Sequence, residues 1–473
     1  MRQNCILSIL TVLILTTLSD GYENYLYRDY SVRNTYNLYD LVNNPAFLRL
    51  NNHEDLMTYE IRTGNQENGY QRAFDPERIE TAGVDIFSYK ALDEKSALAT
   101  RIVYETSSLN NLYRSLEKDF YSDYFSYTDT TTGDVSYAGP RLSVIYNREI
   151  FSRLLTGLQI DYGIERGLKD VYTKCESISR NINVIWGLGY SSYSGTSLGA
   201  SVRYFDRQGS YEAVKEITDT IVNTYMGYHI YYPEQPRSTN EKKVYAEGIE
   251  IDGQLSKKGF LVPSLKIEIA GGYGAKENSI NAGGSSNPVQ RGYWIREGGF
   301  ANSILTYGGK QSKIGLELMA GLKRYHDWAS PGDYDVINIE NSITDIHYGI
   351  KTIIPIQSIS LTIGYEAGSE DVNYHEYTVD YVFDEQLSRS LIFTDVDISL
   401  NQVMQMHYSV WFSNFEPWFY WNTSSIQTQG IEMGVERLFV FGKIGVSFQM
   451  EFWKPNDEMG SIDHFGIAFS FKK

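Results

Sequence analysis

The sequence contains few residues that would cross-link the chain or interrupt extended strands. Its 473 residues include two cysteines and 11 prolines. Cys5 falls within an N-terminal targeting segment, so Cys175 would be the one cysteine of the mature chain. An intrachain disulfide is therefore excluded. We expect one large cooperative element to stabilise the protein instead.

Basic charge and long apolar runs are also scarce. The formal net charge is −17, which argues against a nucleic-acid partner because binding phosphates needs clustered Lys and Arg. After residue 20 no stretch approaches the about 20 apolar residues of a transmembrane helix. Aromatic residues are plentiful, with 39 tyrosines, and 40 glycines accompany them. This composition favours long strands with amphipathic rims.

The first twenty residues are typical of a cleaved signal peptide. Arg2 supplies positive charge, and the apolar run from Ile6 to Leu18 is too short to span a bilayer as a helix. Small residues at Thr17 and Ser19 predict cleavage near residues 19–21. An uncleaved membrane anchor is the alternative.

From about residue 80 to the C-terminus, apolar and polar residues alternate with period two. In the last segment, Phe465, Ile467 and Phe469 alternate with small residues. Successive side chains of a strand point to opposite faces, so each such segment has one apolar face and one small or polar face. About 16 to 18 segments of roughly 9 to 14 residues occur, longer than the strands of most β-sandwiches. They predict an all-β fold, a transmembrane antiparallel β-barrel of about 18 strands, with 14 to 18 possible.

The connections between these segments are expected to alternate between short and long. Short turns are expected at 93–95, 147–152, 191–195, 257–259, 308–312 and 440–442, and long polar connections at 106–139, 207–242, 275–291, 324–334, 369–388 and 454–460. This alternation is typical of a barrel with a periplasmic and an extracellular end, in the bacterial outer membrane. The expected organisation is a signal peptide (1–20), an N-terminal periplasmic lead-in or lumen plug (21–55) and the barrel (56–473).

The long connections are rich in tyrosine, including Tyr121, Tyr124 and Tyr127, then Tyr225 and Tyr228. Such side chains can pack loops against one another, or be displayed to a protein or glycan partner. We favour packing.

The barrel lumen is the expected functional region. If the apolar faces contact lipid, many charged residues point inward, basic ones leading in the early strands and acidic ones in the later strands. These charges can orient a solute, or pair with one another and narrow the lumen. The candidate ligand-binding residues are Arg101, Arg141, Arg203, Lys266, Glu268, Glu317, Asp395, Asp397 and His407.

Catalytic and metal-binding patterns find little support. We see no nucleophile elbow, phosphate-binding loop or zinc-type spacing. His407 and Ser409 share the inward parity, as a barrel hydrolase would need, but two lumen polar residues are the simpler interpretation. Asp457, Glu458 and Asp463 are interpreted as solvated carboxylates rather than a calcium site. We therefore expect no enzyme activity, no cofactor and no metal.

The segment Asn43-Asn44-Pro45-Ala46-Phe47-Leu48 resembles the Asn-Pro-Ala step found ahead of the first strand in many outer-membrane barrels of Bacteroidota. It is distantly similar to barrels of the fatty-acid-transporter type, whose N-terminal segment plugs the lumen. The layout resembles an uncharacterised Bacteroidota family of outer-membrane β-barrels of unknown function. The chain departs from the common barrel ending because Lys472 and Lys473 follow the last aromatic residue.

Two functions are consistent with these patterns. The first is transport or binding of a small solute or lipid through a partly plugged polar lumen. The alternative is a structural or interaction barrel that presents Tyr-rich extracellular loops to a protein or glycan. Expected partners are outer-membrane lipid, the barrel-assembly machinery through the C-terminal strand, and a small solute or lipid.

Overall fold

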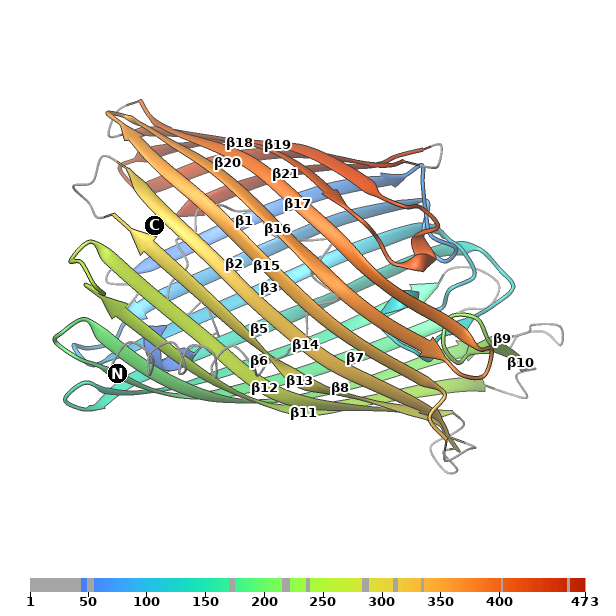
Figure 1. Ribbon diagram of the computed structural model, residues 1–473. Coiled ribbons are helices and arrows are strands. Elements are labelled where there is room, and N and C mark those ends of the chain that lie inside the picture. Colours follow the sequence, from blue (N-terminus) through green and yellow to red (C-terminus); the bar gives the residue numbers. More distant parts are fainter. Residues whose placement is uncertain are drawn as a thin grey trace.

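The computed structural model describes residues 44–48, 55–169, 175–214, 222–234, 239–282, 289–308, 314–332, 336–400, 403–456 and 460–472. Within these residues, eighteen strands form one antiparallel barrel (Figure 1). They are β1 (Leu56–Asn68), β2 (Arg78–Ala91), β3 (Ser96–Leu112), β5 (Gly133–Phe151), β6 (Leu154–Lys169), β7 (Cys175–Ser191), β8 (Thr196–Val214), β11 (Thr239–Lys258), β12 (Leu265–Ala282), β13 (Val289–Tyr307), β14 (Gly315–Pro331), β15 (Ile339–Ile356), β16 (Ile359–Glu376), β17 (Tyr381–Ser399), β18 (Met404–Phe415), β19 (Ile426–Phe439), β20 (Gly442–Pro455) and β21 (Ile462–Lys472).

Every barrel strand pairs with its neighbours in the chain, and the first strand closes the ring with the last. The β1–β21 pairing runs from Thr58 opposite Lys472 to Asn68 opposite Ile462. A closed barrel satisfies its backbone hydrogen bonds between strands and leaves no open edge, which a bilayer requires. The predicted barrel of about 18 strands is confirmed.

The outer face of the barrel is apolar, as the alternation predicts. Its exposed side chains include Ile61, Ile102, Leu158, Trp186, Val202, Ile251, Leu318, Ile350, Ile363, Ile392, Phe412, Val435, Val446 and Phe469. Polar and charged residues alternate with them on the inner face. Exposed apolar surface of this extent is stable only against lipid, and a closed barrel of eighteen strands with a polar interior is the architecture of outer-membrane proteins. The protein is therefore a bacterial outer-membrane β-barrel.

The two ends of the barrel differ. Both termini of the described barrel and most of the short turns lie at one end, which we take as periplasmic, and β9 (Val222–Tyr225) and β10 (Tyr231–Glu234) lie at the other (Figure 1). The expected long connection at 369–388 is wrong: β16 and β17 continue to Glu376 and from Tyr381, leaving a turn of residues 377–380. Polar residues outside the bilayer keep pairing there, so hydrophobicity does not mark the strand ends. The strands reach 20 residues in β11, longer than expected.

Three 3₁₀ turns complete the described elements: η2 (Pro45–Phe47), η3 (Phe120–Ser122) and η4 (Phe419–Trp421). Among the described residues, no helix has the length and apolar character needed to cross a membrane. The expected signal peptide and most of the segment 21–55 lie outside the described residues.

Candidate functional site

All nine predicted lumen residues lie on the inner face of their strands, but they do not form one site. Arg101 borders the cavity described below, and Arg141 lies next to it. The other seven are spread over β8 to β18. Most are held by neighbouring polar residues: Arg101 by Asp85, Arg141 by Glu105 (3.1 Å), Arg203 by Glu250 (3.6 Å), Lys266 by Glu268 (2.6 Å), Asp395 by Ser409 (2.7 Å) and Asp397 by His407 (2.8 Å). Charge pairing across the strands thus occupies much of the lumen wall.

The pair His407 and Ser409 lacks the geometry of a nucleophile and its base. The Ser409 hydroxyl donates to Asp395 Oδ1 at 2.7 Å, whereas His407 Nδ1 lies 2.8 Å from Asp397. A serine nucleophile needs its hydroxyl bonded to the base that takes its proton. Ser409 instead has a carboxylate partner, as a structural lumen residue does. Among the described residues, no group of three or more His, Cys, Asp or Glu is arranged to hold a metal ion.

A cavity of about 510 Å³ lies in the lumen beside β1, β2, β3, β5 and β6. This volume is in the range of small-molecule sites. Its lining is Thr58, Glu60, Asp85, Phe87, Ala99, Thr100, Arg101, Ser143, Ile145, Gln159 and Asp161. The lining is amphipathic, because Phe87, Ala99 and Ile145 form an apolar part toward the periplasmic end, beside and beyond which lie the charged groups Glu60, Asp85, Arg101 and Asp161.

On the periplasmic side of this cavity a short segment lies inside the lumen, residues 44–48, which we call the lumen turn. The Asn44 side chain donates to the carbonyl oxygens of Leu188 (3.3 Å) and Ala200 (3.2 Å) and caps η2 by accepting from Ala46 N. The Asn147 side chain donates to Ala46 O at 2.7 Å. The turn is therefore fixed to the inner wall of β5 to β8.

The wall beneath the lumen turn is made of glycine. A Cβ at Gly187 would lie 2.0 Å from Asn44 Oδ1, and one at Gly199 would lie 2.4 Å from the Phe47 ring. Gly157 and Gly189 face the turn in the same way. Glycine allows such close approach of another backbone. Leu48, next along, packs with Tyr89, Ala97, Ala99 and Ile145, and the last two line the cavity.

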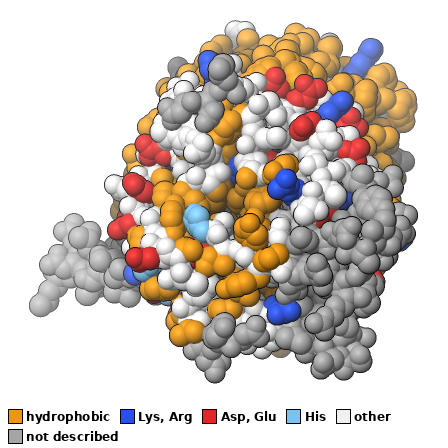
Figure 2. Space-filling model, turned by 90° about the vertical axis from the view of Figure 1, so that its right-hand side faces the viewer, with side chains coloured by type: hydrophobic (Ala, Val, Ile, Leu, Met, Phe, Trp, Pro, Cys, Tyr) orange, Lys and Arg blue, Asp and Glu red, His pale blue; other side chains and the backbone are white. Residues whose placement is uncertain are grey.

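At the extracellular end, residues 113–132 fold inward instead of extending into solvent. We call this segment, between β3 and β5, the closing loop. It contains η3 and β4 (Tyr127–Thr128), and β4 pairs with β9, which pairs with β10. The end face is covered by side chains, with hydrophobic ones gathered across its middle (Figure 2). Among the described atoms on this face, no open channel is visible (Figure 2).

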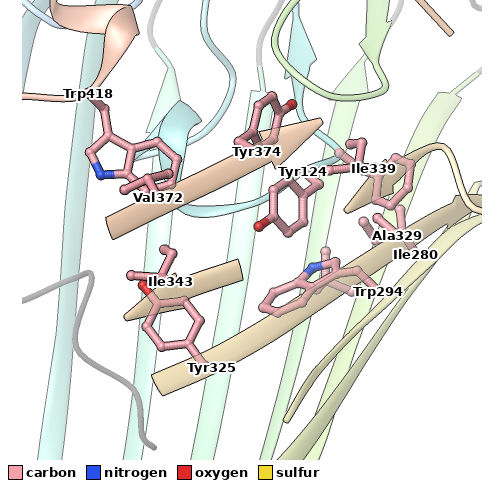
Figure 3. Packing of buried hydrophobic residues seen from close by; sticks show 12 residues of the cluster. Tyr124, Ile280, Trp294, Tyr325, Ala329, Ile339, Ile343, Val372, Tyr374 and Trp418 are labelled. Atoms are coloured by element: carbon pink, nitrogen blue, oxygen red, sulfur yellow. The ribbon is translucent and has the colours of Figure 1, made fainter. Parts of the chain in front are cut away.

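Aromatic packing holds the closing loop against the opposite wall. Tyr124 lies between Trp294 of β13 and Tyr374 of β16 (Figure 3), and its ring meets that of Trp294 edge-on with centroids 5.5 Å apart. The cluster also includes Phe125, Val244, Ile280, Tyr325, Ala329, Ile339, Ile343, Val372 and Trp418. The predicted packing role of the loop tyrosines is confirmed for Tyr121, Tyr124 and Tyr127, which are all buried.

Two buried lysines fix the base of the closing loop. Lys242 of β11 donates to Glu117 Oε1 and to the carbonyl of Phe125, both at 2.6 Å. Lys169 of β6 donates to both Asp129 oxygens at 3.0 Å. Both lysine side chains are fully buried. Burial raises the pKa of Glu117 above its usual value although Lys242 opposes the rise.

A third polar contact lies at the tip of the loop. The Tyr124 hydroxyl donates to Asp327 Oδ2 at 2.7 Å, and Arg296 binds the same carboxylate through two contacts of 2.7 and 2.9 Å. The Asn341 amide donates to the Tyr124 hydroxyl at 3.0 Å. Burial, and next the charge of Asp327, raise the pKa of Tyr124 well above its usual range, so the hydroxyl stays a donor.

Sequence reasoning missed much of this arrangement. Glu60 lies on β1, ahead of the region where alternation is clear. Gln159 and Asp161 alternate with outward Leu158 and Ile160, so parity alone would have found them. No sequence signal shows that the closing loop turns inward, because its contacts come from strands far along the chain.

Residues 45–459 match a family of unknown function (DUF6850). The chain belongs to this family. The membership agrees with the expected family of unknown function, while the likeness to Bacteroidota barrels and fatty-acid transporters stays a prediction. No curated protein matches the sequence.

Among solved structures, the DUF6850 chain is similar to large outer-membrane barrels at very low identity. The match to the copper transporter OprC covers 89% of this chain and 80% of that chain, at 7% identity and a TM-score of 0.45. The siderophore receptor PiuA from Acinetobacter baumannii matches 89% of this chain and 82% of its own (7% identity, TM-score 0.45). The match to OccAB3 from Acinetobacter baumannii covers 89% of this chain and 100% of that chain, at 9% identity and a TM-score of 0.39. Likeness at this level tells nothing of cargo.

Proposed function

We propose that this barrel is a gated conduit for a small polar solute, with the closing loop as its extracellular gate. The observation that carries the proposal is an amphipathic cavity in the lumen of a barrel whose extracellular end is covered by the closing loop and by residues of other connections packed against it. A barrel of eighteen strands is wide enough for an aqueous channel unless something fills it. Here the filling is a loop held by aromatic packing and by a few buried polar contacts, which movement of that loop would release.

We also propose that the segment 21–55 acts as a plug rather than as a lead-in. The position of residues 44–48 against the inner wall supports this role, since the chain enters the lumen before β1 begins. The alternative, display of tyrosines to a partner, is less well supported because most described tyrosines of the closing loop are buried. On β10, Tyr231 and Tyr232 are exposed.

Removing the lysine that fixes the loop tests the conduit. Lys242→Met leaves Glu117 buried without its cation, a change that typically costs about 3–5 kcal/mol. We expect the open fraction to rise roughly a hundredfold or more, since about 1.4 kcal/mol is tenfold. Single-channel conductance of the refolded barrel in a planar bilayer would measure this rise.

The matched control is Arg166→Met, which breaks the exposed Arg166–Glu176 ion pair (2.7 Å) of β6 and β7 and is expected to leave conductance unchanged. A gel-mobility shift on boiling would show that each variant is folded. If folded Lys242→Met and the double variant with Lys169→Met never conduct, the conduit is rejected.

A further inference from the structure

The inward residues around the cavity form rows across the strands. In one row, Arg101 pairs in register with Phe87 on one side and Ser143 on the other, and Ser143 pairs with Asp161. One step toward the extracellular end, on the same inner face of β5, comes Arg141. The cavity and its upper border are therefore built from five neighbouring strands with a fixed register.

The upper border carries more positive than negative charge among its ion pairs. Glu105 is shared by two guanidinium groups: Arg62 Nη2 lies 2.7 Å and Arg141 Nη2 lies 3.1 Å from the same Glu105 Oε2. One carboxylate balances one of the two cations. The Arg141 side chain remains 56% exposed inside the lumen. A guanidinium presents five N–H donors, so donors are left over for a ligand anion.

The opposite imbalance lies in the cavity wall at Asp161. Its carboxylate accepts hydrogen bonds from the amide of Gln159 (3.0 and 2.9 Å) and from the amide of Asn183 (2.9 Å). These amide donors fix the carboxylate in place, but because they are neutral they do not balance its negative charge. A ligand cation would supply the missing charge.

We propose that the cavity binds a small zwitterion of amino-acid or dipeptide size, its carboxylate on Arg141 and its ammonium on Asp161. The row of Arg141 and the row of Asp161 are two positions apart along a strand, which is about 7 Å at the usual strand rise. This separation suits the two ends of a dipeptide. The apolar lining of Phe87, Ala99 and Ile145 would take its small side chains. This inference rests on the proposed conduit and names its solute class.

Binding of dialanine to the detergent-refolded protein, measured by isothermal titration calorimetry, tests the inference. Two blocked forms serve as matched probes: N-acetyl-dialanine keeps the carboxylate alone and dialanine amide keeps the ammonium alone. We expect each blocked form to bind at least tenfold more weakly than dialanine, because each loses one charge-assisted contact. The measurement is repeated in Lys242→Met, in which the gate is released.

The variants assign the two charges separately. Arg141→Gln should weaken the binding of dialanine and N-acetyl-dialanine about tenfold or more and leave the binding of dialanine amide unchanged. Asp161→Asn should weaken the binding of dialanine and dialanine amide by a similar factor and leave that of N-acetyl-dialanine unchanged. Arg180→Gln, a guanidinium on the outer face of β7, is the control and should change nothing. Equal binding of all three probes, no binding, or equal effects of Arg141→Gln and Arg180→Gln would overturn the zwitterion site.

The two proposals fail in different ways. A barrel that conducts after gate release but does not distinguish the three probes loses only the zwitterion site. A barrel that binds dialanine as expected but never conducts loses only the conduit, and the cavity is then a binding site without passage.

Discussion

Four inward glycines on three neighbouring strands decide where the lumen turn can lie. Side chains at these positions would occupy the space of Asn44, Pro45 and Phe47, so the wall and the turn match one another in shape. Not every inward glycine is approached so closely. At Gly466, which also faces inward, a Cβ would meet its nearest atom at 3.7 Å, an ordinary contact distance.

Gly187→Ala should therefore displace the lumen turn. Overpacking of this kind costs about 1–3 kcal/mol, and the Asn44 hydrogen bonds to the wall would be strained or lost. We expect a lower urea midpoint for the refolded barrel and faster protease cleavage ahead of residue 55. Gly466→Ala is the control, and equal behaviour of the two variants would contradict the fit.

For individual side chains, the sequence correctly predicts which face of the barrel wall each one points to, but not which residue it contacts. Period-two alternation placed Arg101, Glu317 and His407 on the inner face, as observed. It gave no basis for choosing among inward charges, because a cavity depends on which neighbours are small and on what fills the rest of the lumen. The candidates from Arg203 to His407 therefore lie apart from the cavity, and their role in ligand binding stays a prediction.

The closing loop is the element whose behaviour departs most from its sequence. A polar connection rich in tyrosine is consistent with a solvent-exposed loop, and only tertiary contacts show that it crosses the mouth. Its buried ionic contacts come from β6 and β11, and its tip reaches β13 to β15. Strand parity cannot reveal such contacts, since they join segments separated by up to 217 residues.

Docking of this loop should not be weakened by acid. Burial, opposed by Lys242 and helped by Asp123, raises the pKa of Glu117 above its usual 4.5. The docked loop then binds the proton more tightly than the free loop, so docking is favoured below the usual pKa and loses this contribution as pH rises through the raised one.

We expect the closed fraction in bilayer recordings to stay constant or rise when pH falls from about 7 to about 4.5. Glu117→Gln should remove that dependence, because its side chain does not titrate. Acid-induced opening of the wild-type barrel that Glu117→Gln abolishes would show that the sign is wrong.

For the whole molecule, closure of the ring gives every barrel strand a partner on both sides. Sequence alternation predicted the barrel and its number of strands because lipid on one face and a polar lumen on the other impose period two on every strand. It did not predict the ends of the strands, as at 377–380, because pairing continues beyond the bilayer where that constraint no longer applies.

A closed ring should resist detergent until it is heated. The mature protein refolded in detergent should run at different positions on a gel before and after boiling, since the barrel's backbone hydrogen bonds must break together. Removal of residues 462–473, which deletes β21, should abolish the difference by leaving one edge of β1 and one edge of β20 without a partner strand. A truncated protein that still shifts would mean that the seam between β1 and β21 is dispensable.

That seam also constrains how the protein can be made. Thr58 and Lys472 are partners although about 400 residues separate them, so the first strand must wait for the last to be synthesised and exported. Until then both edges of the sheet remain open to pairing with other chains, and bringing such distant segments together is slow. Biogenesis therefore requires that a sheet with two unpaired edges be kept from pairing with other chains until its last strand is in place.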